Sequence, residues 1–207
     1  MNHPPRIASA SPRDYSYRRE MTLEERLADE RILFLWGEIN PGSGGALIMR
    51  LLEMQAKHSD RDISLYINSP GGSVDDTLAI YDTMSFLRCD VATYCVGQAA
   101  SGAALILAAG TKGKRFALPH SKIMIHQPYG GVTGQAADIK IQAEEILKAK
   151  RMLNNLLADL TGRSLAQIEE ETERDRFLSP TEAVEYGLVD EIVESSKKMP
   201  KTNKSPT

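Results

Sequence analysis

Short apolar runs alternate along this chain with segments whose apolar residues recur at helical spacing. The run Ile32 to Trp36 is followed by helical spacing from Ala46 to Met54 and by a second strand-like run from Ile63 to Ile67. The same order repeats with a helix over about 74–87 and a strand over 91–96. Parallel neighbouring strands need a crossover, usually a helix, between them. The sequence therefore predicts an α/β fold that winds as a layered spiral.

A long helix is predicted in the second half of the chain, over about 135–161, before Gly162. At 1.5 Å per residue it would be about 40 Å long, which is longer than a domain of this size needs. We therefore expect it to project and its apolar positions to find a partner. The other elements predicted around it are a helix at 101–109, a strand pair at 115–118 and 122–126, helices opened by Ser164 (a capping box with Gln167) and by Ser179-Pro180, and a strand at 188–193.

Length and composition favour one domain with irregular ends. With 207 residues, 42% of them hydrophobic, the chain can bury one sizeable core. Residues 1–20 are rich in Pro, Ser, Arg and Tyr, and residues 196–207 are polar and broken by proline, so both ends are expected to be mobile. The predicted domain is 21–195.

Charge and cysteine content argue against a nucleic-acid-binding protein and against a protein held together by disulfides. The net charge is −3 and the basic residues are dispersed, which argues against a nucleic-acid binder. The two cysteines, Cys89 and Cys95, lie beside apolar runs and are expected to be free thiols, as in a reducing compartment. With no secretory leader and no apolar run long enough for a bilayer, we expect a cytoplasmic protein that is not in a membrane.

A glycine-rich turn at 68–72 follows a predicted strand and opens a helix. Consecutive glycines can present backbone N–H groups to an anion or to a developing oxyanion. Asp75 and Asp76 in the first helical turn would repel a phosphate, and no Lys-Ser or Lys-Thr follows the glycines as in a nucleotide-binding loop. The turn is therefore either an oxyanion site or simple punctuation between strand and helix.

Three residues are candidates for nucleophilic catalysis, each with a plainer interpretation. Ser101 begins a helix of small residues, where it could be an unhindered nucleophile or a helix cap. His126 ends a strand, where a lone histidine is more often structural, and His120 competes with it. Asp175 lies in a charged segment, and spacing alone does not select it from its acidic neighbours.

These motifs together resemble the ClpP peptidase family over about 31–193. The matching stretches are Tyr66–Gly72 (YINSPGG), Ile80–Met84 (IYDTM), Gly97–Ser101 (GQAAS), Gly113–Phe116 (GKRF), Met124–Pro128 (MIHQP) and Thr172–Leu178 (TERDRFL). Several separate motifs in the right order are far more specific than one short pattern.

The resemblance implies a ClpP/crotonase-like fold and a serine endopeptidase of unfolded proteins. In it, Ser101 attacks the peptide carbonyl, His126 takes the proton and Asp175 orients the imidazole. The remaining implied site residues are the oxyanion donors Gly72 and Gly102 and the substrate-pairing strand Gly130, Gly131 and Val132. Neither a metal nor a cofactor is expected.

The resemblance also implies an assembly. Two stacked seven-membered rings, of one kind of subunit or together with a paralogue, enclose the sites, with the 135–161 helix as the handle between rings. An ATP-driven AAA+ unfoldase such as ClpX, ClpA or ClpC docks on the axial face, and residues 1–20 are an axial loop or a propeptide. The implied docking pocket comprises Ser64, Tyr66, Phe86, Tyr94 and Phe116.

The sequence departs from the family pattern at three places that concern function. Gly102-Ala103 replaces Met-Gly, so the substrate side of the site loses a side chain. The stretch 75–77, Asp-Asp-Thr, replaces smaller and more neutral residues, and Ser64 replaces a tyrosine of the docking pocket. A lower affinity for the unfoldase is therefore expected.

Two other functions remain as alternatives. A non-catalytic ring subunit beside active paralogues usually lacks a triad residue, whereas this chain has all three. A crotonase-type acyl-CoA enzyme would share the fold, but it needs an acid–base set, such as a pair of glutamates, that is not visible here.

Overall fold

The computed structural model describes residues 21–128, 131 and 133–195. Within them a seven-stranded sheet runs in the order β1–β2–β3–β4–β7, and all of these neighbours pair in parallel. β5 pairs in parallel with the end of β3, and β6 pairs antiparallel with β5. The strands are β1 (Ile32–Trp36), β2 (Ile63–Ser69), β3 (Val91–Ala100), β4 (Arg115–Ala117), β5 (Lys122–Ile125), β6 (Arg176–Leu178) and β7 (Glu191–Ile192).

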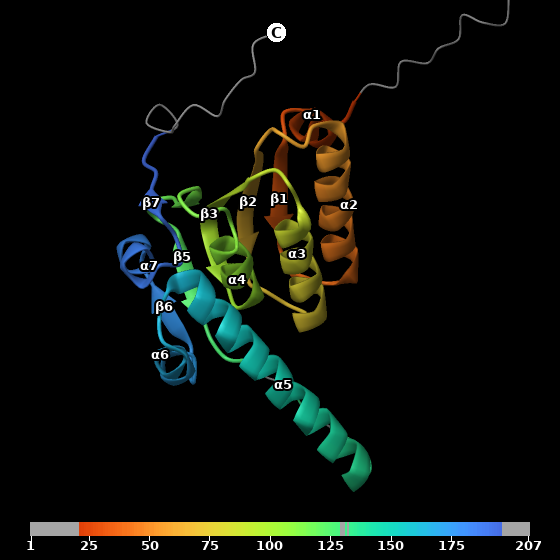
Figure 1. The fold of residues 1–207 in the computed structure, drawn as a ribbon, viewed down its shortest axis with the longest axis vertical. Coiled ribbons are helices and arrows are strands. Elements are labelled where there is room, and N and C mark those ends of the chain that lie inside the picture. Colours follow the sequence, from red (N-terminus) through yellow and green to blue (C-terminus); the bar gives the residue numbers. More distant parts are fainter. Residues whose placement is uncertain (1–20, 129–130, 132, 196–207) are drawn as a thin grey trace, which may run out of the picture.

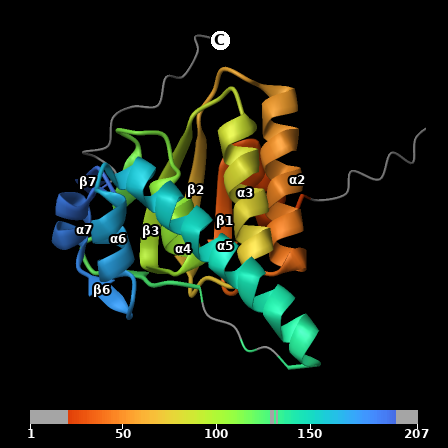
Figure 2. The ribbon, with the colours of Figure 1, turned by 60° about the horizontal axis from the view of Figure 1, so that its bottom comes forward.

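Helices cover one face of this sheet, as Figures 1 and 2 show for α2, α3 and α4. The helix α5 lies across the end of this layer and extends well beyond the rest of the fold. Its apolar residues Leu153, Leu156 and Leu157 pack against the core, whereas Ile139, Ile141 and Leu147 are exposed in the single chain. The helices are α1 (Leu23–Asp29), α2 (Pro41–Lys57), α3 (Val74–Phe86), α4 (Gly102–Ala108), α5 (Ala136–Thr161), α6 (Leu165–Glu171) and α7 (Pro180–Tyr186).

The predicted α/β class and the projecting helix are confirmed. Strands β1 to β3 and helices α2 to α5 appear where hydrophobic periodicity predicts them, with ends shifted by a few residues. The capping box of Ser164 with Gln167 is present, and Gly162 ends α5 in a left-handed conformation. Cys89 and Cys95 are buried free thiols. None of the helices in the described part of the chain is long and apolar enough to span a bilayer.

The predicted pairing of the strands at 115–118 and 122–126 with one another is wrong. β4 pairs with Thr93–Cys95 and β5 with Gln98–Ala100, so both add to the same side of one long strand, β3. Ten residues of β3 give room for two successive short neighbours. The last strand is also shorter than predicted, and α1 and β6 were not predicted.

The helix α4 consists of small and apolar residues, and the six residues from Ala103 to Ala108 are all buried. Thr93 of β3 donates a hydrogen bond from Oγ1 to the carbonyl of Leu107 at 2.7 Å. The helix therefore lies directly on the sheet, and a single residue separates its start at Gly102 from the end of β3 at Ala100. Ser101 occupies this junction.

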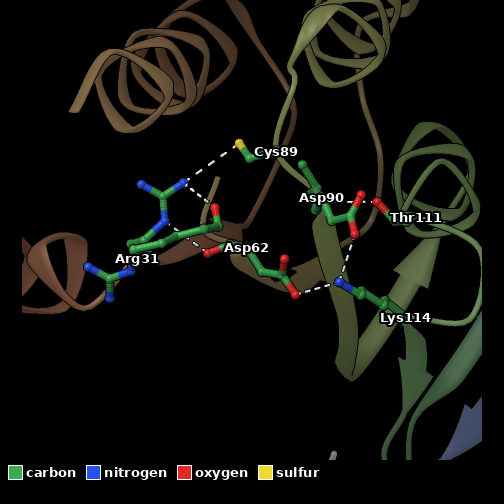
Figure 3. Close-up of polar contacts among 8 residues, drawn as sticks. Arg31, Asp62, Cys89, Asp90, Thr111 and Lys114 are labelled. Carbon is green, nitrogen blue, oxygen red and sulfur yellow. Dashed lines mark hydrogen bonds and ion pairs between the residues drawn. The ribbon is translucent and has the colours of Figure 1, made fainter. Parts of the chain in front are cut away.

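A buried arginine joins elements at the opposite end of the strands (Figure 3). Arg31 is 4% exposed, and its guanidinium donates to the carbonyls of Asp62, Met54 and Arg61 at 2.9, 2.9 and 2.6 Å and contacts Sγ of Cys89 at 3.6 Å. Nearby, Nζ of Lys114 bridges the carboxylates of Asp62 and Asp90. These bonds connect the starts of β1, β2 and β3 away from the catalytic candidates.

A second buried arginine holds the C-terminal part of the chain. Arg115 of β4 contacts Asp190 through Nε and a terminal nitrogen at 3.0 and 2.7 Å, and it also donates to the carbonyl of Leu160. Burial alone would raise the pKa of the Asp190 carboxyl, but the hydrogen bonds and charge of Arg115 outweigh this and lower it. The pair therefore ties β7 and the end of α5 to the sheet.

Candidate active site

Ser101 lies at the β3–α4 junction in a strained backbone conformation, with φ 56° and ψ −125°. Positive φ is uncommon for a residue other than glycine and is often found at functional sites. Although Ser101 takes the N-cap position, its side chain makes no capping hydrogen bond. The interpretation of Ser101 as a capping serine is therefore wrong.

The Ser101 hydroxyl is directed instead to a histidine. Its Oγ lies 2.8 Å from Nε2 of His126, and Nδ1 of His126 lies 3.0 Å from Oδ1 of Asp175. An ionised carboxylate can only accept hydrogen bonds, so Nδ1 carries the proton and Nε2 is left to accept one from Ser101. This tautomer is the one a general base requires.

Strand pairing explains how residues so far apart in sequence meet. His126 directly follows β5, and Asp175 directly precedes β6. The antiparallel register pairs Ile125 with Arg176, which brings the two neighbouring residues to the same end of the ladder. Parallel pairing of β5 with Gln98–Ala100 places Ser101 beside the same edge. The competitor His120 is exposed in the loop before β5.

The glycine-rich turn packs directly against the nucleophile candidate. Gly71 has φ +89°, and a Cβ there would lie 2.6 Å from the carbonyl oxygen of Ala100 and 2.7 Å from Cβ of Ser101. Only glycine fits such an approach. The turn is held on its other side by Ile39, whose N–H donates to the Gly71 carbonyl and whose carbonyl accepts from Ser73, both at 2.9 Å. Among the described residues, neither the Gly72 nor the Gly102 N–H donates to a backbone carbonyl in this region.

A cleft of about 700 Å³ surrounds these groups. Ser101, His126, Asp175 and the glycines 71, 72 and 102 lie along it. The charged residues that line it in the described part of the chain, Glu38 and Asp175, are both acidic. Its apolar lining residues are Pro70, Val74, Leu105, Met124, Pro128, Leu153 and Leu157. A concave site with a largely apolar lining and a few polar groups is the usual form of a ligand-binding site.

Aromatic side chains form a row on the sheet face away from the helices. The rings of Tyr66, Tyr94 and Phe116 stack with centroids 4.7 and 5.0 Å apart, and Phe34 and Trp36 continue the row at 5.8 and 6.5 Å. Of the predicted docking residues, Ser64 lies on β2 two residues before Tyr66, whereas Phe86 is at the end of α3 and exposed. Tyr94 and Phe116 are buried, so the exposed rings of the row are Phe34 and Trp36.

Of the three residues predicted to pair with substrate, the structure describes one. Gly131 is exposed, and Gly130 and Val132 lie outside the described residues. Sequence reasoning missed Glu38 and Ile39, which reach the site from the segment between β1 and α2. No motif marks them, because their position depends on a bridge between Ile39 and Gly72 across the fold.

Comparison with known proteins finds matches over most of the chain. The family model described as Clp protease matches residues 16–196. A curated relative from Rhodopirellula baltica, named "ATP-dependent Clp protease proteolytic subunit 1", is 51% identical over 185 residues, which are 89% of this chain and 82% of the relative. On these matches, the chain belongs to the Clp protease family.

Proposed function

We propose that this chain is a serine endopeptidase in which Ser101, His126 and Asp175 form the catalytic triad. The observation that carries the proposal is the unbroken series of contacts, 3.0 Å from Asp175 to His126 and 2.8 Å from His126 to Ser101, along one cleft. A serine hydroxyl becomes a useful nucleophile when an oriented base removes its proton.

The reaction follows from these positions. Oγ of Ser101 bonds to the peptide carbonyl carbon while Nε2 of His126 takes the hydroxyl proton, and the carbonyl π electrons move onto the oxygen. The N–H groups of Gly72 and Gly102 are the proposed donors to that oxyanion. The proton then passes to the leaving amine as the C–N bond breaks. Water repeats the sequence on the acyl-enzyme, which releases the new carboxylate and restores Ser101.

As a Clp protease, the chain is a ring-forming peptidase that works with Clp ATPases. We further propose two stacked seven-membered rings with α5 as the handle between them, and an AAA+ unfoldase of the ClpX, ClpA or ClpC kind on the axial face. The peptidase domain is 21–195. Substrate would add as an extended strand beside Gly130, Gly131 and Val132, and Ser64, Tyr66, Phe86, Tyr94 and Phe116 are the proposed docking residues.

Covalent labelling tests the triad without a guessed substrate. The assembled protein is treated with a fluorophosphonate, and the modified peptide is located by mass spectrometry. We expect one adduct, on Ser101, none on Ser101→Ala and a strongly reduced rate for His126→Ala. An intact, assembled protein without an adduct at Ser101 at any pH would contradict the proposal. Labelling only after mixing with a paralogue would instead indicate a site activated by a partner ring.

A further inference from the structure

One wall of the cleft is formed where α3 meets α4, through Thr77 and Gly102. Thr77 is 1% exposed, and its Oγ1 donates to the Ser73 carbonyl at 2.7 Å. This bond fixes the rotamer of a side chain that is already stiff because of branching at Cβ. Both residues line the cleft beside Ser101.

The two residues share one space. A Cβ at Gly102 would lie 2.4 Å from Oγ1, 3.1 Å from Cγ2 and 3.2 Å from Cβ of Thr77. The threonine side chain therefore occupies the volume into which a side chain at position 102 would extend. The departures from the family pattern at 75–77 and at 102–103 thus meet in a single contact.

This contact adjoins the part of the cleft that the acyl side of a substrate would enter. Gly102 follows the proposed nucleophile and carries a proposed oxyanion donor, so its backbone is fixed relative to the reacting carbonyl. Beyond it the cleft is lined by apolar side chains, among them Leu105, Met124 and Leu153. Removing Thr77 atoms would enlarge this apolar space without altering any of the proposed catalytic groups.

We infer that Thr77 is a specificity-determining residue: its side chain, in place of one at position 102, limits the size of the pocket for the substrate residue whose carbonyl is attacked. The inference rests on the proposed serine peptidase mechanism. The pocket accepts uncharged side chains, and trimming Thr77 makes it accept larger ones. A side chain at position 102 would collide with Oγ1 of Thr77, so enlargement at 102 requires reduction at 77.

The first test compares substrates that differ in one side chain. Wild type, Thr77→Ala, Thr77→Ser and Thr77→Gly are assayed on peptides with Ala, Leu or Phe before the cleaved bond. We expect the kcat/KM ratio of Phe to Ala to rise about tenfold in Thr77→Gly, because a single methylene in an apolar pocket changes discrimination by 10-fold or more. Thr77→Ser, which keeps the hydroxyl, should shift the ratio less in the same direction.

Matched controls separate pocket size from helix damage. Thr77→Val keeps the shape without the hydroxyl and should leave the ratio unchanged. Thr83→Ala removes an equivalent bond from Oγ1 to the carbonyl of Ala79, 2.7 Å long, on an exposed part of α3, and it should also leave the ratio unchanged. An unchanged ratio in both Thr77→Ser and Thr77→Gly would overturn the inference.

The second test is a paired substitution. In Gly102→Ala, most labelling at Ser101 should be lost. In the double variant Gly102→Ala with Thr77→Gly, the labelling rate should be at least tenfold higher than in Gly102→Ala, since the added methyl then has room. Failure of the double variant to recover, with assembly intact, contradicts the size-sharing contact. If wild-type Ser101 is not labelled, the proposed function fails instead, so the two failures are distinguishable.

Discussion

Asp175 holds Nδ1 of His126 at 3.0 Å although 59% of the Asp175 side chain is exposed. The histidine, in contrast, is 12% exposed. An exposed carboxylate gains little from a surface ion pair, so its value lies in fixing the tautomer of the more buried imidazole.

Replacing this carboxylate by an amide should therefore disable the site while the fold persists. In Asp175→Asn the amide can donate to Nδ1, which leaves the proton on Nε2 and removes the acceptor for Ser101. We expect a loss of about 10⁴-fold in kcat, measured with a fluorogenic peptide. His120→Ala is the matched control and should retain activity. A loss below tenfold for Asp175→Asn would contradict the orienting role.

The strained backbone at Ser101 predicts an unusual order of stabilities. Alanine keeps the steric cost of φ 56°, whereas glycine adopts positive φ freely. Ser101→Gly should therefore be more stable than Ser101→Ala by about 1 kcal/mol, although both are inactive. Urea unfolding at one subunit concentration measures the difference. A glycine variant that is less stable than the alanine variant would show that the conformation is not strained.

The pair of Arg115 and Asp190 predicts a pH-dependent contribution to stability. Because Arg115 holds the pKa of the Asp190 carboxyl below its usual range, the stabilisation is complete above the unfolded value, about 3.9. This stabilisation is lost as the pH falls through the pKa of Asp190 in the folded state, which is lower. Asp190→Asn should cost about 3 kcal/mol at pH 7 by leaving a buried cation without its partner.

Thermal unfolding of wild type and Asp190→Asn at several pH values checks this sign. The difference in unfolding free energy should be constant from pH 6 to 8 and shrink only in acid. A difference that grows as the pH falls would contradict it.

The exposed apolar residues of α5 predict an assembly that depends on this helix. Ile141 and Leu147 are 58% and 53% exposed in the single chain, which is costly in water. Ile141→Glu with Leu147→Glu should give smaller species in native mass spectrometry, whereas Gln142→Glu on the same helix should not. If the double variant still forms full-size assemblies, the prediction that α5 makes the contact between rings is wrong.

Ser64 predicts weak docking of the unfoldase. It lies on β2 two residues before Tyr66, so both side chains project from the same face of the sheet. Ser64→Tyr adds aromatic surface there, and we expect about fivefold tighter binding of ClpX, with Ser64→Ala as the control. Affinity unchanged by the tyrosine, measured by biosensor on intact rings, would exclude Ser64 from the docking surface.

The sequence was sufficient for the elements whose pattern is local. Periodicity marks β1, β2, α3 and the long α5, and capping residues mark the start of α6. The choice of Asp175 was different, because it depends on β6 pairing with β5 across about fifty residues. A three-residue strand has too few residues to show alternation. The contact of Thr77 with Gly102 could not be predicted from the sequence either, since it arises from the packing of two helices.

The order of the catalytic candidates along the chain also has a consequence during synthesis. His126 follows Ser101 by 25 residues, but Asp175 follows His126 by a further 49. At 5–20 residues per second, the ribosome adds Asp175 about 2–10 s after His126. The growing chain thus contains the proposed nucleophile and base for seconds before the proposed acid that orients the base, and β6 must still join the sheet. On the proposed mechanism, a nascent subunit would therefore be a poor peptidase while it is still near other unfolded chains.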